Sequence, residues 1–198
     1  MKKNDLLMLG VGGQGIVLAS DILSEVAMAA GYDVKKTDTL GMAQRGGSVV
    51  SHVRIADKVW SPLIKEGEVD ILVAFEKLEA ARWSYFLSKN GAAIVNNQTT
   101  PPLSVSLGTG RYPEDKEIEE ILKRSANRFY LIDGTSYAQE LGDIRTLNML
   151  MLGSVSSLLP IDVKTWKDCI SQRLSSNIIV NMAAFDKGRE EMSRAGVR

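Results

Sequence analysis

Gly10-Val11-Gly12-Gly13-Gln14-Gly15 follows the apolar run Leu6-Leu7-Met8-Leu9 and precedes a stretch of helical periodicity that begins at Ile16. This order predicts a strand, a glycine-rich turn and a helix, as at the start of a Rossmann-like α/β fold. The glycines allow a tight turn and a close approach of the backbone, and the free N–H groups at the helix start favour an anion. Because glycine also forms turns that bind nothing, a ligand site and a structural turn are equally open here.

The residues around these glycines separate two kinds of nucleotide site. The glycine spacing matches a nucleotide triphosphate loop, but Ile16 and Val17 stand where that loop needs Lys and then Ser or Thr. A dinucleotide loop stays open, because Asp33 or Asp38 lies at a suitable distance to bind ribose hydroxyls from a second strand. Gln14 is not required by pyrophosphate binding. The sequence therefore excludes a nucleotide triphosphate site, and an NAD(P)-binding site remains as an interpretation.

Strand and helix patterns alternate along the rest of the chain. Residues 48–55, a break at 56–58 and residues 59–61 predict a β-hairpin, which would introduce antiparallel pairing. The other expected strands are 5–9, 34–37, 70–75, 92–96 and 129–133, and the expected helices are 16–30, 77–87, 113–126, 147–159, 163–174 and 176–192. This order predicts an α/β protein: a three-layer α/β/α sandwich with a mixed, mostly parallel sheet.

Length and charge narrow the class of protein. A chain of 198 residues with 44% hydrophobic content suits one buried core, so we expect a single domain over 1–198. Its 24 basic and 24 acidic residues balance, which argues against binding to nucleic acid or to a membrane surface. The first apolar run is too short for a secretory signal, and no stretch reaches the roughly 18 apolar residues of a membrane span. We therefore expect a cytoplasmic protein.

The cysteine and histidine counts limit the chemistry that this chain supplies alone. One cysteine, Cys169, allows neither an internal disulfide nor a four-thiolate iron–sulfur or zinc site. Its helical spacing predicts a packed side chain rather than a nucleophile. The one histidine, His52, lies in an alternating strand without a second ligand nearby, so a metal or triad role is not expected. No metal site and no catalytic residue are predicted.

A second glycine-rich segment lies between a predicted strand and the predicted hairpin, Leu40-Gly41-Met42-Ala43-Gln44-Arg45-Gly46-Gly47-Ser48. A flexible surface turn would explain its glycines. Arg45, however, adds a fixed cation with planar donors, and Gln44 adds both a donor and an acceptor. Since loops at the carboxyl ends of strands share the ligand edge of an open α/β sheet, we expect the loops 10–15 and 41–48 to converge on one site.

Four segments in order resemble one family. They are Gly10 to Gly15, Gln44-Arg45-Gly46-Gly47 before Ser-Val-Val-Ser-His-Val-Arg, the 70–76 segment Asp-Ile-Leu-Val-Ala-Phe-Glu, and the 148–153 segment Asn-Met-Leu-Met-Leu-Gly. Together they resemble the gamma-type subunit or domain of 2-oxoacid:ferredoxin oxidoreductases. Within that family, the chain is most similar to the small (beta) subunits specific for indolepyruvate. The resemblance covers essentially the whole chain.

The resemblance implies a function in a hetero-oligomer. Enzymes of this family decarboxylate a 2-oxoacid such as pyruvate or indolepyruvate on thiamine diphosphate, pass electrons through iron–sulfur clusters to ferredoxin, and transfer the acyl group to coenzyme A. This chain has neither cluster cysteines nor an evident Gly-Asp-Gly thiamine motif, so the thiamine diphosphate, Mg and clusters are expected on a catalytic partner subunit. This subunit, inactive alone, would then complete the active site or the coenzyme A region.

The residues carried over by this resemblance belong to the two loops. They are Gly10, Gly12, Gly13, Gln14 and Gly15 in the first loop, and Gln44, Arg45, Gly46 and Gly47 in the second. Asn148 is interpreted as a structural residue. We also expect a partner surface around these loops, with an apolar part near Met8 and Met42. A stand-alone NAD(P)-binding reductase and an interaction scaffold with a vestigial loop remain as alternatives.

Overall fold

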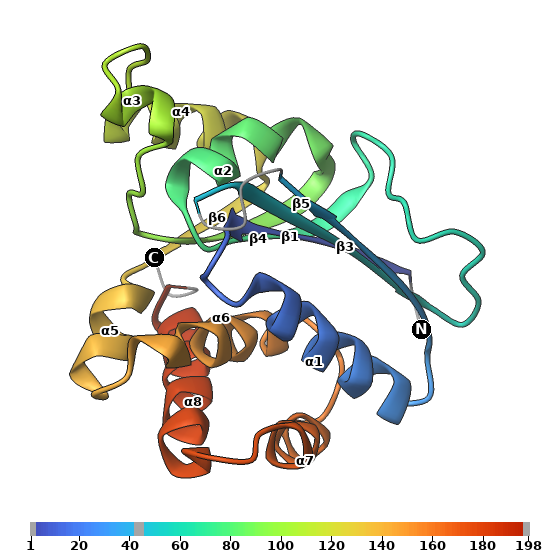
Figure 1. Ribbon diagram of the computed structural model, residues 1–198. Helices are drawn as coiled ribbons and strands as arrows, with labels where there is room; N and C mark the ends of the chain where they lie inside the picture. Colours follow the sequence, from blue (N-terminus) through green and yellow to red (C-terminus); the bar gives the residue numbers. More distant parts are fainter. Residues whose placement is uncertain (1–2, 42–45, 196–198) are drawn as a thin grey trace.

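The computed structural model describes residues 3–41 and 46–195 of the chain (Figure 1). Within these residues six strands form one sheet in the order β2-β3-β1-β4-β5-β6. The strands are β1 (Asn4–Val11), β2 (Asp33–Leu40), β3 (Ser48–Ala56), β4 (Val69–Ala74), β5 (Leu87–Asn96) and β6 (Arg128–Ile132). β1, β4, β5 and β6 pair in parallel, whereas β3 is antiparallel to both β1 and β2. The prediction of a mixed, mostly parallel sheet is confirmed.

Helices cover both faces of this sheet, as Figure 1 shows. One side carries α1 (Ile16–Ala29), α5 (Gly134–Glu140), α6 (Leu147–Ser156), α7 (Val163–Arg173) and α8 (Ile178–Ala195). The other side carries α2 (Lys77–Trp83), α4 (Asp115–Ser125) and the short α3 (Leu103–Ser106). The predicted three-layer α/β/α sandwich is therefore confirmed. Among the described residues, no helix combines the length and the apolar character needed to span a membrane.

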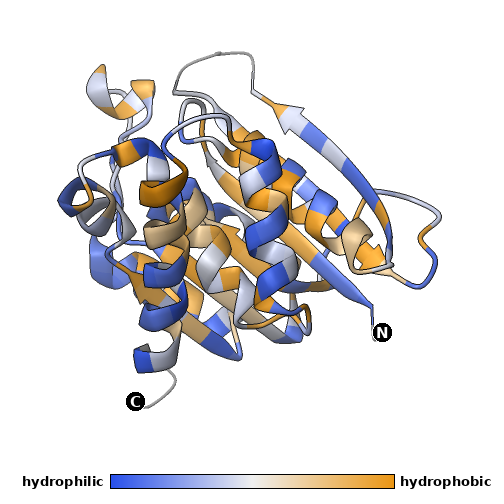
Figure 2. Cartoon of the chain, turned by 90° about the horizontal axis from the view of Figure 1, so that it is seen from below, coloured by the Kyte–Doolittle hydropathy of each residue, from blue (hydrophilic) through white to orange (hydrophobic). Residues whose placement is uncertain are grey.

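The alternation of side chains along β1 explains the two core layers. Leu6 and Met8 pack with α1 and α6 on one side of the sheet, and Leu7 and Leu9 pack with α2 and α4 on the other. Because successive side chains of a strand point to opposite faces, a continuous apolar run is required where both faces are covered. Figure 2 shows this pattern as hydrophobic colour along the central strands and hydrophilic colour on outward-facing helix turns. Met8 is fully buried, so it cannot itself form the apolar part of the expected partner surface.

Helices α6 and α8 cross with their backbones in contact. A Cβ atom added at Gly153 would lie 2.0 Å from the carbonyl oxygen of Phe185, and one added at Gly188 would lie 1.9 Å from that of Leu150. The hydroxyl of Ser154 donates to the carbonyl oxygen of Gly188 over 3.2 Å at the same crossing. The glycine that ends the 148–153 segment is therefore required by helix packing. It fixes α6, whose first turn faces the glycine loop.

The structure corrects the predicted hairpin at 48–61. Residues 59–61 form no strand, and β3 pairs with β1 and β2 instead. The N–H of Val59 donates to the Asp33 side chain, while Trp60 is 87% exposed. Other differences are smaller: β2 extends beyond 34–37, β5 begins before residue 92, and the helix from Lys77 ends at Trp83 before a 3₁₀ turn η1 (Ser84–Phe86). The helices α3 and α5 were not predicted.

Candidate functional site

The two glycine-rich loops meet at the carboxyl edge of the sheet. The N–H of Gly12 donates to the carbonyl oxygen of Gly47 over 2.8 Å, and Gly41 donates to Ser48 over 2.9 Å at the β2–β3 turn. The Ser48 hydroxyl in turn donates to the buried carboxylate of Glu79 over 2.6 Å, which ties this turn to α2. The candidate residues Gln44 and Arg45, together with Met42, lie outside the described residues. Binding of a common ligand by the two loops stays a prediction.

Gln14 joins the ends of two neighbouring parallel strands. Its Oε1 accepts the N–H of Val11 at the end of β1 over 2.8 Å, and its Nε2 donates to the carbonyl oxygen of Phe75 just beyond β4 over 3.2 Å. A side chain at Gly10 would collide with it, since a Cβ there would lie 2.7 Å from Oε1. Gln14 and Gly10 therefore form a structural pair. After β1 the chain continues to β2 on one side of the strand order, and after β4 it continues to β5 on the other side. This pair therefore occupies the switch point where α/β sheets commonly bind ligands.

The polar network continues across the next two strands. The Phe75 carbonyl oxygen also accepts from the Asn96 side chain over 3.1 Å. Asn96 donates to the Thr135 hydroxyl over 2.9 Å and accepts the Thr135 N–H over 3.0 Å. These bonds connect the ends of β4, β5 and β6. The side-chain amides of Gln14 and Asn96 form hydrogen bonds with the backbone at these strand ends and so hold the ends at a fixed spacing.

A pocket of about 430 Å³ opens beside this network. Its wall combines the glycine loop with the ends of β5 and β6, α5, the 3₁₀ turn η2 (Ile144–Thr146) and the first turn of α6. The lining residues are Gly13, Gln14, Gly15, Gln98, Thr100, Thr135, Gln139, Ile144, Arg145, Leu147 and Asn148. Three of the nine predicted site residues thus line one pocket. The lining is mainly uncharged donors and acceptors with one cation.

Two glycines keep the floor of this pocket open. Gly13 has φ +108°, and a Cβ atom added there would meet nothing within 4 Å, so this residue exposes bare backbone to the pocket. Gly15 has φ +79°, and a Cβ there would lie 2.9 Å from Nδ2 of Asn148. Both positions favour glycine because L side chains avoid positive φ. Asn148 is more than a helix-packing residue, because its amide forms part of the wall.

Arg145 is the cation of the pocket, and it is paired within the chain. Its guanidinium donates to both oxygens of Asp143, with the shortest contact at 2.8 Å. The Arg145 side-chain and backbone hydrogen bonds lower the pKa of Asp143 to about 2. The Arg145 side chain is 79% exposed. Because most of the guanidinium is open to solvent, an anionic ligand can approach it and compete with Asp143.

The geometry does not provide a dinucleotide site. That site needs the acidic residue at the end of a strand adjacent to β1, but here β3 lies between β1 and β2. Asp38 accepts from Ser51 and pairs with Lys36, and Asp33 accepts from Val59 at the start of β2. Neither carboxylate lines the pocket. The alternative of an NAD(P) reductase has no support in this arrangement.

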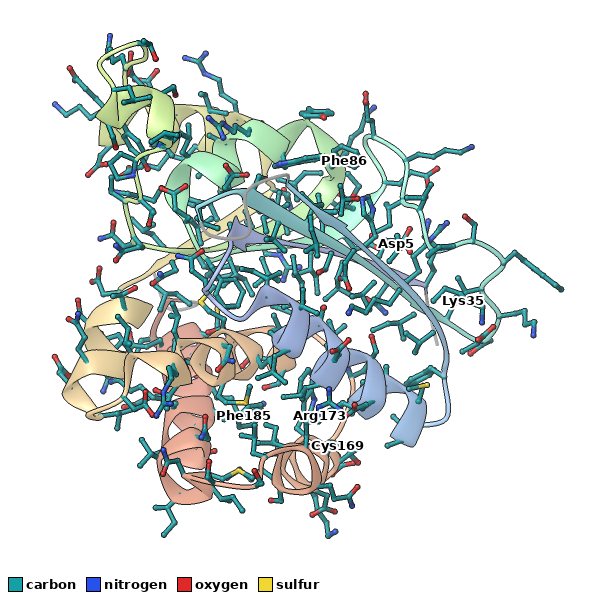
Figure 3. The ribbon with its side chains drawn as sticks, viewed as in Figure 1. Asp5, Lys35, Phe86, Cys169, Arg173 and Phe185 are labelled. Atoms are coloured by element: carbon teal, nitrogen blue, oxygen red, sulfur yellow. The ribbon has the colours of Figure 1, made fainter. Side chains whose placement is uncertain are left out.

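Cys169 and His52 take the packed roles that their sequence context predicts. Cys169 is buried in α7, on the side of the sheet that carries α1 and α6, and Figure 3 labels it near Arg173. Burial raises the pKa of its thiol. His52 is buried on β3, its Nδ1 accepts the N–H of Ile64 over 3.3 Å, and burial lowers its pKa. Across residues 3–41 and 46–195, no group of three or more His, Cys, Asp or Glu side chains is placed to hold a metal ion.

Several lining residues were not predicted from sequence. Gln98 and Thr100 belong to the polar run 96–100 after β5, and Thr135 follows Asp133-Gly134 after β6. Polar residues directly after a buried strand were the available signal, since the carboxyl ends of parallel strands share an edge. Arg145 and Gln139 had no such signal, because they reach the pocket through the short elements α5 and η2.

Comparison with known proteins identifies the family of this chain. A family model described as pyruvate ferredoxin/flavodoxin oxidoreductase matches residues 5–191. The chain belongs to this family. The Indolepyruvate oxidoreductase subunit IorB of Pyrococcus horikoshii is 35% identical over 192 residues, covering 95% of each chain. The IorB subunit of Archaeoglobus fulgidus is 37% identical over 187 residues, covering 93% of this chain and 92% of that one. The resemblance inferred from the four ordered segments is confirmed.

Solved structures of oxoacid oxidoreductases share the fold of this chain. The gamma subunit of a keto/oxoacid ferredoxin oxidoreductase from Geobacter sulfurreducens matches with a TM-score of 0.71 and 22% identity, over 96% of this chain and 99% of that one. A 2-oxoglutarate:ferredoxin oxidoreductase from Magnetococcus marinus, solved with 2-oxoglutarate, coenzyme A and succinyl-CoA bound, matches with a TM-score of 0.72 and 20% identity. That match covers 98% of this chain and 32% of the longer one.

Proposed function

We propose that this chain is the subunit without redox cofactors of a 2-oxoacid:ferredoxin oxidoreductase that acts on indolepyruvate or a related aryl pyruvate. The names of its relatives support this assignment. The reaction would convert the 2-oxoacid and coenzyme A into an acyl-CoA and carbon dioxide, with two electrons passed to ferredoxin. Thiamine diphosphate with Mg and the iron–sulfur clusters would be held by the partner subunit and would supply the decarboxylation and electron transfer.

Within this enzyme the 430 Å³ pocket would bind an anionic part of coenzyme A. The pocket lies in the range of about 300–1,000 Å³ that is usual for small-molecule sites, and it offers one guanidinium among neutral amides and hydroxyls. Arg145 would exchange its contact with Asp143 for a phosphate, whose geometry suits a planar fork of donors. The bare backbone at Gly13 would allow close approach. The observation that carries the proposal is this pocket at the carboxyl edge, formed by the glycine loop and the start of α6.

Arg145→Gln in the complete complex tests the proposal. The substitution should raise the KM for coenzyme A about tenfold, the effect of losing one charge-assisted contact of about 1.4 kcal/mol, and leave the KM for the 2-oxoacid unchanged. Arg124→Gln is the matched control, because Arg124 is also an exposed arginine paired with one carboxylate, Glu120, but on α4. An unchanged KM for coenzyme A in a well-folded Arg145→Gln complex would remove the pocket from the coenzyme A site. Assays with several 2-oxoacids test the substrate.

A further inference from the structure

An uncharged segment projects from the carboxyl edge of the sheet. We define the α3 arm as residues 99–110, Thr-Thr-Pro-Pro-Leu-Ser-Val-Ser-Leu-Gly-Thr-Gly, which contain no Asp, Glu, Lys or Arg. At the 24% charged content of the whole chain, about three charges would be expected in such a stretch. Figure 1 shows α3 extending beyond α4 and away from the sheet. A projecting segment without charge is unusual for a surface that stays in water.

The α3 arm presents two leucines to its surroundings. Leu103 and Leu107 are 72% and 68% exposed, and no residue of α3 is buried. Their spacing of four residues places them on the same face of the helical turn. Most of the surface of both side chains is therefore left uncovered by residues 3–41 and 46–195. Interface cores are depleted of charge and enriched in apolar side chains, which is the composition seen here.

The arm is held in shape at its tip and at its base. Near the tip, the N–H and the hydroxyl of Thr109 donate to the carbonyl oxygen of Ser104 over 2.9 and 3.0 Å. At the base, Oε1 of the buried Glu76 accepts the N–H of Thr100 over 3.1 Å and the hydroxyl of Tyr112 over 2.5 Å. One carboxylate thus fastens both ends of the arm. A pre-shaped arm loses less conformational entropy on binding than a loose loop does.

The position of the arm connects it to the candidate site. Thr100 lines the pocket and is the second residue of the arm, and Gln98 lines the pocket just before it. We propose that the α3 arm is a docking element that inserts Leu103 and Leu107 into an apolar pocket of the cofactor-bearing partner subunit. This inference rests on the proposed function, because that function supplies the partner. Docking there would place the partner over the pocket that contains Arg145.

A second exposed apolar loop provides the comparison. Trp60 and Leu63, 87% and 59% exposed, lie in the loop 57–68 at the opposite edge of the sheet. This loop carries five charged residues, and the ammonium of Lys58 lies 5.3 Å from the centre of the Trp60 ring. Charged neighbours are typical of a surface exposed to water. The α3 arm is therefore the better candidate for the partner contact.

The experiment measures binding of this chain to its separately expressed partner subunit by titration calorimetry. Leu103→Ser with Leu107→Ser should weaken binding about a hundredfold, since each buried leucine contributes about tenfold, and should leave the melting temperature unchanged. Leu63→Ser, the matched control on the charged loop, should bind as the unchanged chain does. Ser106→Lys, which adds a charge beside the leucines, should also weaken binding without affecting the fold.

The outcomes separate this inference from the proposed function. If the unchanged chain binds no partner, the proposed function fails before the arm is tested by any variant. If the unchanged chain and both arm variants bind the partner with equal affinity, the docking role of the arm is overturned. Weaker binding by Leu63→Ser alone would place the partner at the opposite edge instead. If the arm variants abolish self-association and leave partner binding intact, the arm joins two copies of this chain, and the inference is also wrong.

Discussion

The side-chain amide of Gln14 donates to the carbonyl oxygen of Phe75 over 3.2 Å, just beyond the end of β4. The same side chain accepts the N–H of Val11, so one residue joins the ends of both strands. In a fold of this kind, the space beyond the ends of these two strands is a common ligand position. Here a glutamine fills it, and the pocket opens to one side, toward β5, β6 and α6.

Gln14→Ala should lower the free energy of unfolding by about 1–2 kcal/mol, because the N–H of Val11 loses its acceptor in a part-buried position. Urea denaturation of the isolated chain gives this value. Gln139→Ala is the control, since Gln139 lines the same pocket with an exposed side chain and should change stability by less than about 0.5 kcal/mol. Equal stability of the two variants would show that Gln14 does not hold the strand ends.

Gly153→Ala should be among the most damaging single substitutions in the chain. Its Cβ would lie 2.0 Å from the Phe185 carbonyl oxygen, so α6 and α8 must separate, at a cost of about 3 kcal/mol. Gly31→Ala meets no atom within 4 Å and suffers only from its φ of +88°, so it should cost about 1 kcal/mol. Thermal unfolding of both variants checks the difference. A Gly153→Ala chain as stable as Gly31→Ala would contradict the close crossing.

The pH dependence of stability should contain a contribution from His52. Burial lowers the pKa of His52 in the folded chain, so the unfolded chain binds a proton first as the pH falls. The stabilising effect of the neutral ring is complete above the ordinary histidine pKa of about 6.5 and decreases below it. The melting temperature should therefore fall more between pH 7 and pH 5 for the unchanged chain than for His52→Gln. Parallel curves over this range would refute the assignment; above pH 7.5 the curves should run parallel.

Gly13→Val tests the glycine loop as a ligand site. The left-handed backbone at Gly13 makes valine unfavourable by about 1–2 kcal/mol, and its Cβ atom would meet no atom of the described residues within 4 Å. Gly67→Val, with φ +74° and equally open space, should lose similar stability. Activity of the complete enzyme should fall at least about tenfold for Gly13→Val alone, because valine would obstruct the ligand. Equal activity of the two variants would leave the glycine loop with a structural role.

Arg45→Ala examines the second loop. Because the sequence predicts a solvent-exposed loop here, we expect a change in stability within about 0.5 kcal/mol, with a clear loss of ferredoxin-linked activity in the complete enzyme. Melting temperature and activity are measured on the same preparation, with Arg124→Ala as the control for loss of one arginine. Full activity of a well-folded Arg45→Ala complex would remove this residue from the site.

The sequence predicted the strands and long helices well, because apolar periodicity reports which faces are buried. It failed for the hairpin at 48–61, since periodicity does not identify the partner of a strand. β3 pairs with β1 and β2, and Val59 is held by the Asp33 side chain rather than by a neighbouring strand. α5 was missed because its sequence, Gly-Thr-Ser-Tyr-Ala-Gln-Glu, has too few apolar residues to show a helical period.

The candidate site could be predicted only in part for a related reason. The meeting of the two glycine loops follows from the rule that parallel strands end at one edge, and the bond between Gly12 and Gly47 shows that contact. Arg145 and Gln139 come from short elements that no periodic pattern marks, and Asn148 lies on a helix that is buried along its whole length. Tertiary packing alone brings these residues to the loop.

The crossing of α6 and α8 has a consequence during synthesis of the protein on the ribosome. The glycine loop at 10–15 emerges early, but its facing wall includes Asn148 on α6, and α6 is locked through Gly153 and Gly188 against α8. Chains that have been translated only as far as α7 therefore carry the loop without a fixed opposite wall. Although N-terminal parts fold first during translation, the glycine loop must wait until α8 has been made before the pocket has its final shape.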